Sequence, residues 1–376
     1  MIHCSFLLWT YLLAAPGRGE EPDIVRTAAR VIEERMQDGA DARLLREAAV
    51  QGMARWLDEQ SGTEGNGLLT QAEYEQLMAR LRGERVGLGI EFTVAPGRGL
   101  LVAEVVEGSV ADTSGLRPGD LVVAIDDLPF TGVSAQGILA VVAELADRPR
   151  DQLVVLDLRR EDGALRRVEL RPSPYRAPMV SVDQAEDRLI LRVGVIGPGT
   201  AQAVGRALRP LGERTLVLDL RDLDEADLEA LSELAGVFLG PDVTVLRTLD
   251  PKGQARTIRS RGDALVDRRI VVLINRGTGG LAEGLAQALR SHGRAVLVGT
   301  RSAGRANHPS FHPIGEGLVL KLTDTALQAE DGSSWAGQGL GPDLVVEPLQ
   351  VPLVGAARTG LPDIQVEAGI RFISAP

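Results

Sequence analysis

The most constraining feature of this 376-residue sequence is a regular alternation of short apolar runs and amphipathic segments in its second half. Runs such as TLVLDL, RIVVLIN and AVLVGT have the length and composition of buried strands. The segments 200–211, 227–239 and 282–292 carry apolar residues at helical spacing. Because strands that alternate with helices form a sheet covered by helices, residues 178–348 are predicted to be an α/β domain.

The rest of the sequence is patterned differently. From residue 22 to 85, apolar residues recur three or four positions apart, which predicts helices. Thr70, with Glu73 three residues later, has the pattern of a capping box at a helix start. Residues 86–172 alternate in the manner of short strands and include one helical stretch. Residues 349–376 are weakly patterned and receive no predicted role.

The segment 86–172 resembles a PDZ domain of the bacterial protease type. It contains VGLGIEF, the strand LLVAEVVEG, the turns LRPGD and AIDDLPF, and the helical stretch AQGILAVVAELA. The resemblance implies a small β-barrel whose glycine loop binds a peptide's terminal carboxylate and whose strand edge accepts an added strand. The residues implied for peptide binding are Gly87, Leu88, Gly89, Ile90, Phe92, Ile138 and Val142.

The segment Ile270–His308 resembles the catalytic segment of the tail-specific (C-terminal processing) proteases. That family has a crotonase-like core and a serine–lysine dyad. Its serine lies in a small-residue turn before a helix, and its lysine lies in a turn after the next strand. Alignment on Glu283, on LAQALRSHGRA and on VLVGT puts Gly280 at the serine position and Arg305 at the lysine position.

Both replacements remove the chemistry that the dyad needs. A hydroxyl nucleophile requires an oxygen on Cβ and a neighbouring base that can take its proton, and Gly280 has no Cβ. A buried lysine can become such a base, whereas a guanidinium stays protonated. Arg305 is therefore expected to act only as a cation.

A third family feature is also changed. Leu216–Leu239 resembles the family segment in which a glycine pair after a strand directs backbone N–H groups at the developing oxyanion. This chain carries acidic side chains there, in Asp222-Leu223-Asp224-Glu225-Ala226-Asp227. Negative side chains at that place would oppose the formation of an oxyanion.

Two hydroxyl residues remain as alternative nucleophiles. Thr278 and Ser302 lie in the same two turns, a few positions from the places the family uses. The only lysines, Lys252 and Lys321, lie outside the dyad turn. Whether Arg305 pairs with an acidic group such as Glu283 is open at this stage.

Composition narrows the possible partners. The formal net charge of −11 argues against a nucleic-acid partner, because phosphate binding needs clustered basic side chains. The four histidines do not form a ligand pattern, since prolines exclude a helix at His308 and His312, and metal binding needs more ligands than these two. No metal or cofactor is predicted.

The start of the chain resembles a secretory signal. An apolar run, Phe6–Ala15, is followed by small residues and then charge, which suggests cleavage after Ala15 or Gly17 and a signal segment of residues 1–17. The run is too short for a stable membrane span. The sole cysteine, Cys4, would leave with the signal, so no disulfide is expected. These observations predict an extracytoplasmic, periplasmic or secreted protein.

Three functional hypotheses follow. The leading one is an exported member of the tail-specific protease family that lacks hydrolytic chemistry and binds protein C-termini through its PDZ domain. The second is a working endopeptidase with a non-standard nucleophile, Thr278 or Ser302. The third is an assembly protein in which the PDZ groove is blocked and the N-terminal helices hold subunits together.

Overall fold

The structure is a computed structural model that describes residues 23–36, 41–61, 65–95, 97–146, 152–160, 162–348 and 363–374. The expected signal segment and Cys4 lie outside the described residues. The chain divides into two compact units, residues 1–68 and 69–376. The boundaries of the smaller predicted parts stay predictions.

The first unit consists of two helices, α1 (Ile24–Arg35) and α2 (Ala42–Ser61). Asp23 caps α1 by accepting a hydrogen bond from the backbone N–H of Arg26. The only buried apolar side chains of the two helices are the small ones of Ala29 and Ala54. The larger apolar side chains of this unit are mostly exposed.

The second unit begins with α3 and a β-rich part. Strand β1 (Gly67–Thr70) leads into α3 (Gln71–Leu81), and the predicted capping box of Thr70 and Glu73 is present. Strands β2 (Glu84–Gly87) and β9 (Ser173–Arg176) pair at the two ends of the β-rich part. Between them lie β3 (Ile90–Ala95), β4 (Gly99–Val105), α4 (Val110–Thr113), β5 (Leu121–Ile125), β6 (Leu128–Pro129), α5 (Ala135–Ala146), β7 (Val154–Arg159) and β8 (Leu165–Leu170).

The β-rich part has its own apolar core. Its main sheet has the order β3-β4-β5-β7-β8, so β3 is an edge strand. Alternate residues of these strands, such as Leu156 and Leu158 on β7, point into the core together with Phe130 and Ile138. This burial explains why the segment alternates between apolar and polar residues.

The remaining residues form the α/β core. Its central sheet has the order β10-β11-β12-β15-β16-β19, and all neighbours after β10 are parallel. The strands are β10 (Val180–Gln184), β11 (Arg188–Val193), β12 (Thr215–Asp219), β15 (Ile270–Ile274), β16 (Ala295–Gly299) and β19 (Leu344–Val345). A second, antiparallel sheet contains β13 (Thr244–Leu249), β14 (Ala255–Arg259), β17 (Asn307–Gly315) and β18 (Leu318–Gln328).

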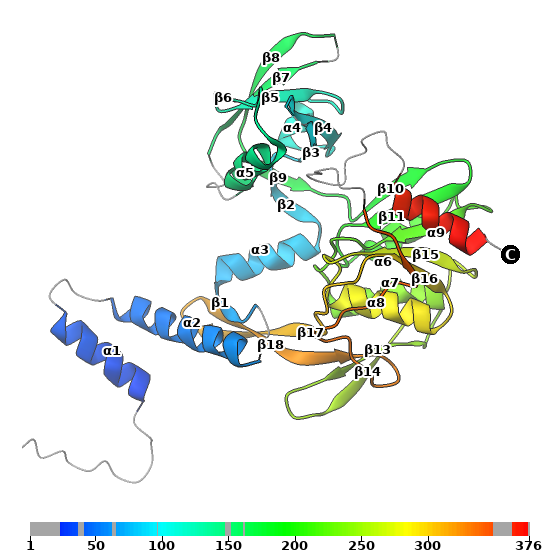
Figure 1. The fold of residues 1–376 in the computed structure, drawn as a ribbon. Helices are drawn as coiled ribbons and strands as arrows, with labels where there is room; N and C mark the ends of the chain where they lie inside the picture. The colour runs from blue at the N-terminus through cyan, green and yellow to red at the C-terminus, as the bar shows by residue number, and fades with distance from the viewer. Residues whose placement is uncertain are drawn as a thin grey trace, which may run out of the picture. The chain divides into compact units, whose positions relative to one another are not determined.

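Helices cover both faces of the central sheet. On one face α6 (Thr200–Ala207), α7 (Leu228–Leu239) and α8 (Leu281–Ser291) pack on Leu218, Val272 and Leu297. On the other face α9 (Ile364–Ser374) packs on Val217 and Val271. Figure 1 shows α8 and α9 on opposite sides of this sheet. Strands β15 and β16 are apolar throughout because both of their faces are buried.

Helix α9 is the main element that the sequence pattern did not predict. Residues 349–376 were expected to have no role, but Ile364–Ser374 are helical and Val366 is buried against the sheet. Its apolar residues Val366, Ile370 and Ile373 recur at helical spacing, but such spacing does not show which surface the helix covers. Its identity as a sheet-covering helix therefore depends on the tertiary contact with the apolar strand face.

Candidate active-site remnant

Three turns follow strands β12, β15 and β16 of the central sheet and meet at one end of it. Asp222 follows β12, residues 277–280 follow β15, and residues 302–305 follow β16. Strand ends of this kind are where parallel α/β sheets usually form their sites, because the loops there can converge. The sequence-predicted residues Gly280, Thr278, Ser302 and Arg305 are all in these turns.

Gly280 stands at the N-terminus of α8 in an unusual backbone conformation. Its φ of 59° and ψ of −125° lie in a region that residues with side chains rarely adopt. A Cβ at this position would lie 3.8 Å from the carbonyl oxygen of Asn307 and 3.9 Å from that of Arg305, which are ordinary contacts. The turn therefore has room for a side chain, and the groups closest to that position among the described residues are hydrogen-bond acceptors.

Glu283 holds two of the turns together. Its side chain is fully buried, and it accepts hydrogen bonds from the N–H of Gly280 at 3.0 Å, of Gly304 at 2.7 Å and of Arg305 at 2.9 Å. It also accepts a hydrogen bond from the hydroxyl group of Ser302. A buried carboxylate is stable only when such donors surround it, so Glu283 fixes the spacing between the start of α8 and the turn after β16.

Arg305 pairs with Asp224 and not with Glu283. Its Nη2 lies 3.0 Å from Asp224 Oδ2 and donates to the carbonyl oxygen of Gly277 at 3.3 Å. The guanidinium lies directly on Gly279, where a Cβ would meet its atoms at 2.4–2.6 Å. The arginine can hold this position only beside a glycine, and a side chain at position 279 would displace the guanidinium. The ion pair is largely exposed, with side-chain exposures of 44% and 53%, so its free-energy contribution is small.

The two alternative nucleophiles are both hydrogen-bonded to structural groups. The buried hydroxyl of Thr278 donates to the carbonyl oxygen of Leu220 at 2.8 Å and accepts from the N–H of Asn275 at 3.1 Å. The buried hydroxyl of Ser302 donates to Glu283 and accepts from the N–H of Leu340 at 2.6 Å. Among the described residues, neither hydroxyl hydrogen-bonds a lysine, arginine or histidine side chain, and the side-chain partner of Ser302 is the carboxylate of Glu283.

The acidic loop after β12 is also tied to its neighbours. Asp222, with a left-handed φ of 60°, donates its N–H to Asn275 Oδ1 and accepts from Asn275 Nδ2, both at 2.9 Å. Leu223 accepts the N–H of Gly279 at 2.9 Å, so that donor does not face an incoming oxyanion. Asp227 caps α7. The acidic residues of this loop thus have structural partners.

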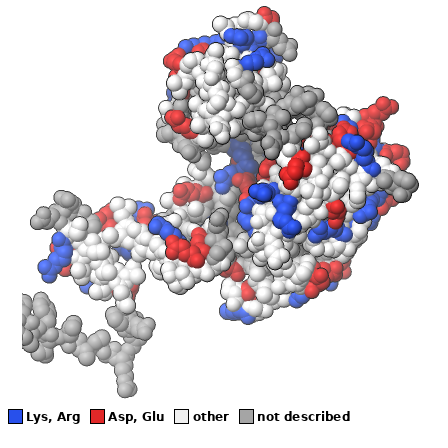
Figure 2. Space-filling model, viewed as in Figure 1, with Lys and Arg blue, Asp and Glu red and all other residues white. Residues whose placement is uncertain are grey.

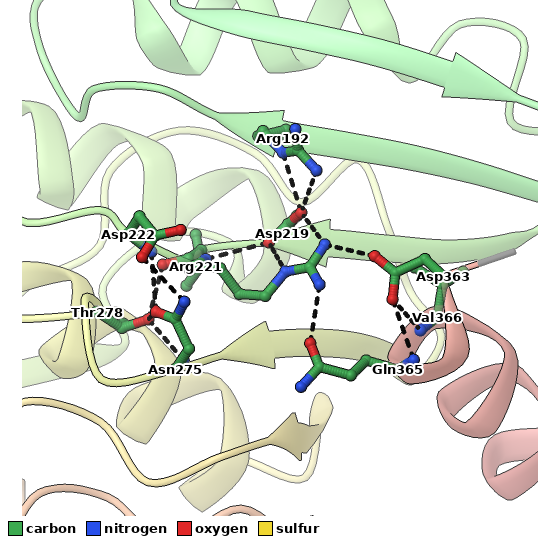
Figure 3. A network of polar contacts seen from close by, with 10 residues as sticks. Arg192, Asp219, Arg221, Asp222, Asn275, Thr278, Asp363, Gln365 and Val366 are labelled. Carbon is green, nitrogen blue, oxygen red and sulfur yellow. Dashed lines mark hydrogen bonds and ion pairs between the residues drawn. The ribbon is translucent and has the colours of Figure 1, made fainter. Parts of the chain in front are cut away.

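A buried ionic network lies beside this loop (Figure 3). The carboxylate of Asp219, which has no exposed surface, is bound by Arg221 at 2.7 Å and by Arg192 at 3.0 Å. Burial raises the pKa of Asp219, but the hydrogen bonds and charges of Arg221 and Arg192 outweigh it and leave the pKa below its ordinary value. Burial lowers the pKa of Arg221, and its acidic partners more than reverse this effect. Both groups are charged.

Edge strand β3 and helix α5, which the PDZ resemblance implies would line the peptide groove, lie next to each other. The carbonyl oxygens of Leu88 and Gly89 accept hydrogen bonds from Ala111 and Val106, at 3.2 and 2.9 Å. Their own N–H groups donate to no other described residue. Gly89 has a φ of 73°, and a Cβ there would lie 2.2 Å from the Ser109 Cβ. The loop thus presents two N–H groups at the end of an open strand edge.

The apolar residues expected to line this groove differ in accessibility. Ile90 and Val142 are half-buried, and Gly87 lies at the end of β2. Phe92 is mostly buried, and Ile138 has no exposed surface and packs within the core of the β-rich part. Val142 is therefore better placed than Ile138 to contact a ligand side chain. Half-buried Leu139, on the same helix, was not predicted.

Comparisons with known proteins agree with these two parts. Residues 191–346 match peptidase family S41, and residues 101–160 match a PDZ domain. The matched segment lies within the α/β core, which is called the S41 core below because residues 191–346 resemble this family. The carboxyl-terminal-processing protease of Synechocystis sp. is 28% identical over 319 residues, which cover 82% of this chain and 73% of that protein. The probable CtpA-like serine protease of Staphylococcus haemolyticus is 22% identical over 80% of this chain but only 59% of that protein.

Two solved structures share the fold of this chain. The photosystem II D1 C-terminal processing protease has a TM-score of 0.51 and 20% identity, with 93% of this chain and 90% of that chain covered. A putative S41 protease from Bacteroides fragilis has a TM-score of 0.56 and 16% identity, with 97% and 92% covered. The prediction of a multidomain α/β protein with a PDZ domain and a tail-specific protease core is confirmed.

The described residues offer no metal centre to the S41 core. No three His, Cys, Asp or Glu side chains come together as metal ligands in the part of the chain that the structure describes. His308 and His312 lie on strand β17, and the Nε2 of His292 contacts the carbonyl oxygen of Thr244 at 2.8 Å.

None of the described helices is both long and apolar enough to cross a membrane. Figure 2 shows basic and acidic side chains interspersed on the visible face.

Sequence reasoning missed Glu283 as the centre of the site and Asp224 as the partner of Arg305. Glu283 was considered as an alignment point of the helix and as a possible partner of Arg305, although its position three residues after Gly280, at a helix start, is a signal for a capping carboxylate. Asp224 was recognised as acidic, but nothing in the sequence indicates which cation it approaches.

Proposed function

We propose that this protein is an S41-family pseudoprotease that binds the C-terminal tails of other proteins through its PDZ domain. The observation that carries the proposal is the geometry at Gly280, where the turn before α8 has room for a side chain but carries no attacking oxygen. Arg305, at the lysine position, is held by Asp224 and cannot accept a proton.

Tail binding is supported by the loop and the strand edge of the PDZ domain. The N–H groups of Leu88 and Gly89 can receive a terminal carboxylate, and the β3 edge can pair with an added strand. Val142 and Leu139 on α5 offer apolar surface for the terminal side chain. We therefore expect ligands to be polypeptides that end in an apolar residue with a free carboxylate.

The decisive experiment compares hydrolysis and binding by the same purified protein. An unstructured polypeptide with an apolar C-terminus is incubated with the protein, and its intact mass is followed; we expect no cleavage. The same peptide, with a free or an amidated C-terminus, is titrated by fluorescence anisotropy; we expect binding only with the free carboxylate. Turnover that disappears in Thr278→Val or Ser302→Ala, with the fold retained by circular dichroism, refutes the pseudoprotease and supports the peptidase alternative.

An assembly role is a second candidate, favoured by the N-terminal unit. Nine of the 18 exposed large apolar side chains of the described residues lie between Ile24 and Leu57, although α1 and α2 bury only two alanines. Two helices with so little core are expected to need a partner, and a second copy would present the same apolar faces. A monomer in analytical ultracentrifugation, or carboxylate-dependent peptide binding at full occupancy, excludes an assembly protein with a blocked groove.

We also infer export, from the apolar run Phe6–Ala15 and the small residues after it. One relative, from Arabidopsis thaliana, is named a chloroplastic carboxyl-terminal-processing peptidase, and is 25% identical over 80% of this chain. Sequencing the N-terminus of the mature protein tests the inference. A start after Ala15 or Gly17 is expected, and a start at Met1 excludes cleavage.

A further inference from the structure

Helix α9 packs closely on side chains of the central sheet. A Cβ added at Gly369 would meet Val271 Cγ1 at 2.6 Å, so the helix sits too close for any side chain at that position. Val366 is buried on the same face, and Ile370 and Ile373 pack beside it. The position of α9 along the sheet is therefore closely defined by packing.

The N-terminus of α9 is joined to the end of β12 through one side chain. Asp363 caps the helix by accepting the N–H of Gln365 at 3.0 Å, and its other oxygen accepts from Arg221 Nη2 at 2.7 Å. Gln365 Oε1 accepts from Arg221 Nη1 at 2.8 Å, and Gln365 Nε2 donates to the carbonyl oxygen of Val346. Arg221 thus makes both of its α9 contacts with adjacent nitrogens of a planar guanidinium.

Arg221 also hydrogen-bonds both carboxylate oxygens of Asp219. Its Nε donates to Asp219 Oδ1 at 2.8 Å, and its Nη2 is shared between Asp219 Oδ2 and Asp363 Oδ2. Asp219 is fully buried, and the side chain of Arg221 is nearly so, with 17% of its surface exposed. Without the Asp363 carboxylate, Arg221 and Arg192 would share the single carboxylate of Asp219, so one positive charge of this group would lack a partner.

The residue after Arg221 begins the acidic loop of the site. Asp222 adopts its left-handed conformation with Asn275 bound to both its N–H and its carboxylate. Asn275 Oδ1 also accepts the N–H of Gly277, and Asp224, two residues further on, holds Arg305. A continuous set of covalent and hydrogen bonds therefore runs from α9 to the residues around Gly280, and Figure 3 shows its first part.

We propose that α9 is a positioning strap for the remnant active site, with Arg221 as the positioning residue. When α9 is docked, Asp363 and Gln365 fix the guanidinium of Arg221, and this fixes the backbone at Asp222 and the loop that carries Asp224. When α9 leaves the sheet, Arg221 loses two acceptors and the loop loses its anchor. Arg305 is then released from the turn at Gly279.

Hydrogen exchange measured by mass spectrometry on the full chain tests this coupling. Asp363→Asn removes the charge that pairs with Arg221, and we expect exchange in residues 221–227 and 275–280 to become about tenfold faster or more. Glu367→Gln is the matched control, because Glu367 lies on the same helix but pairs with Arg188 at 2.8 Å, away from Arg221. It should leave the exchange of both site segments unchanged.

The labelling rate of a thiol at position 280 measures how accessible the turn before α8 is. In a Cys4→Ser background, Gly280→Cys places the only thiol of the chain at the start of α8, where a Cβ has room. We expect iodoacetamide to label this thiol faster when Asp363→Asn is added and at an unchanged rate when Glu367→Gln is added. A melting curve by circular dichroism shows whether each variant is folded.

Three results overturn the proposal. One is α9 exchanging faster in Asp363→Asn while residues 221–227 do not change. Another is an equal effect of Glu367→Gln on the site segments. The third is no change anywhere in the double variant Asp363→Asn/Gln365→Ala, which removes both α9 acceptors of Arg221.

Discussion

The guanidinium of Arg305 occupies the space where a side chain at position 279 would lie, 2.4–2.6 Å from that Cβ position. Gly279 and Arg305 are therefore mutually dependent: the arginine can lie across the turn only because the glycine has no side chain. The same arrangement brings Arg305 to Asp224 at 3.0 Å. Arg305 thus lies across the turn before α8, paired with Asp224 and hydrogen-bonded to the carbonyl oxygen of Gly277.

Gly280→Ser is expected to yield a folded protein without peptidase activity. The new Cβ has ordinary contacts, but the positive φ of 59° should cost about 1–2 kcal/mol of stability. Arg305 stays protonated and cannot take the proton of the new hydroxyl, and the nearby Glu283 carboxylate already accepts four hydrogen bonds. Urea unfolding and a peptide cleavage assay measure the two effects. Gly97→Ser, also at positive φ and with open space, controls for the backbone strain; measurable turnover by Gly280→Ser alone would contradict the prediction.

Glu283→Gln should destabilise the protein strongly. The buried carboxylate accepts four hydrogen bonds, and an amide would turn an N–H₂ group toward backbone N–H donors. Loss of charge-assisted bonds of this kind costs about 2–3 kcal/mol. The free energy of unfolding from urea titration tests this. Glu229→Gln, at an exposed pair with Arg261, should change it by less than about 0.5 kcal/mol, and equal effects of the two substitutions would show that the Glu283 network contributes little.

Gly89→Ala is expected to weaken carboxylate-dependent peptide binding strongly. The new Cβ would lie 2.2 Å from the Ser109 Cβ, so the loop that presents the N–H groups of Leu88 and Gly89 must move. Gly97→Ala is the matched control, because it has a similar φ of 71° and nothing within 4 Å of its Cβ. Anisotropy titration with a free-carboxylate peptide should show a loss of at least about tenfold in affinity for Gly89→Ala. Unchanged affinity in that variant would place the ligand elsewhere.

His308 should make the protein less stable in mild acid. Burial holds the pKa of His308 below its ordinary value of 6.5, against the opposing charges of Asp227 and Asp324. The unfolded chain then binds a proton that the folded chain does not. The stability contribution is therefore present above pH 6.5 and is lost as the pH falls from there through the folded pKa.

Urea midpoints between pH 7.5 and pH 5.5 measure this loss. The decrease should be smaller in His308→Asn than in the original protein, whereas His312→Asn, at a half-exposed side chain, should keep it. If His308→Asn shows the same decrease as the original protein, another group is responsible for it.

Local sequence predicted the elements of the S41 core well. The apolar runs at β12, β15 and β16 became buried parallel strands, and the pattern around residues 282–292 became α8, one residue earlier than expected. The capping box at Thr70 formed as predicted. These features depend on spacing within a few residues, and such spacing can be read directly from the chain.

The sequence by itself determined that Gly280 has no nucleophilic oxygen and that Arg305 is a cation, since these properties belong to the residue types. Only the tertiary structure decided that Asp224 is the partner of Arg305, that the hydroxyls of Thr278 and Ser302 are hydrogen-bonded to structural groups, and that α9 reaches Arg221. Arg305 and Asp224 are 81 residues apart, and Arg221 and Asp363 are 142 apart. Pairings over such separations are set by how the strands order in the sheet, and no local pattern encodes which of many charged residues will meet.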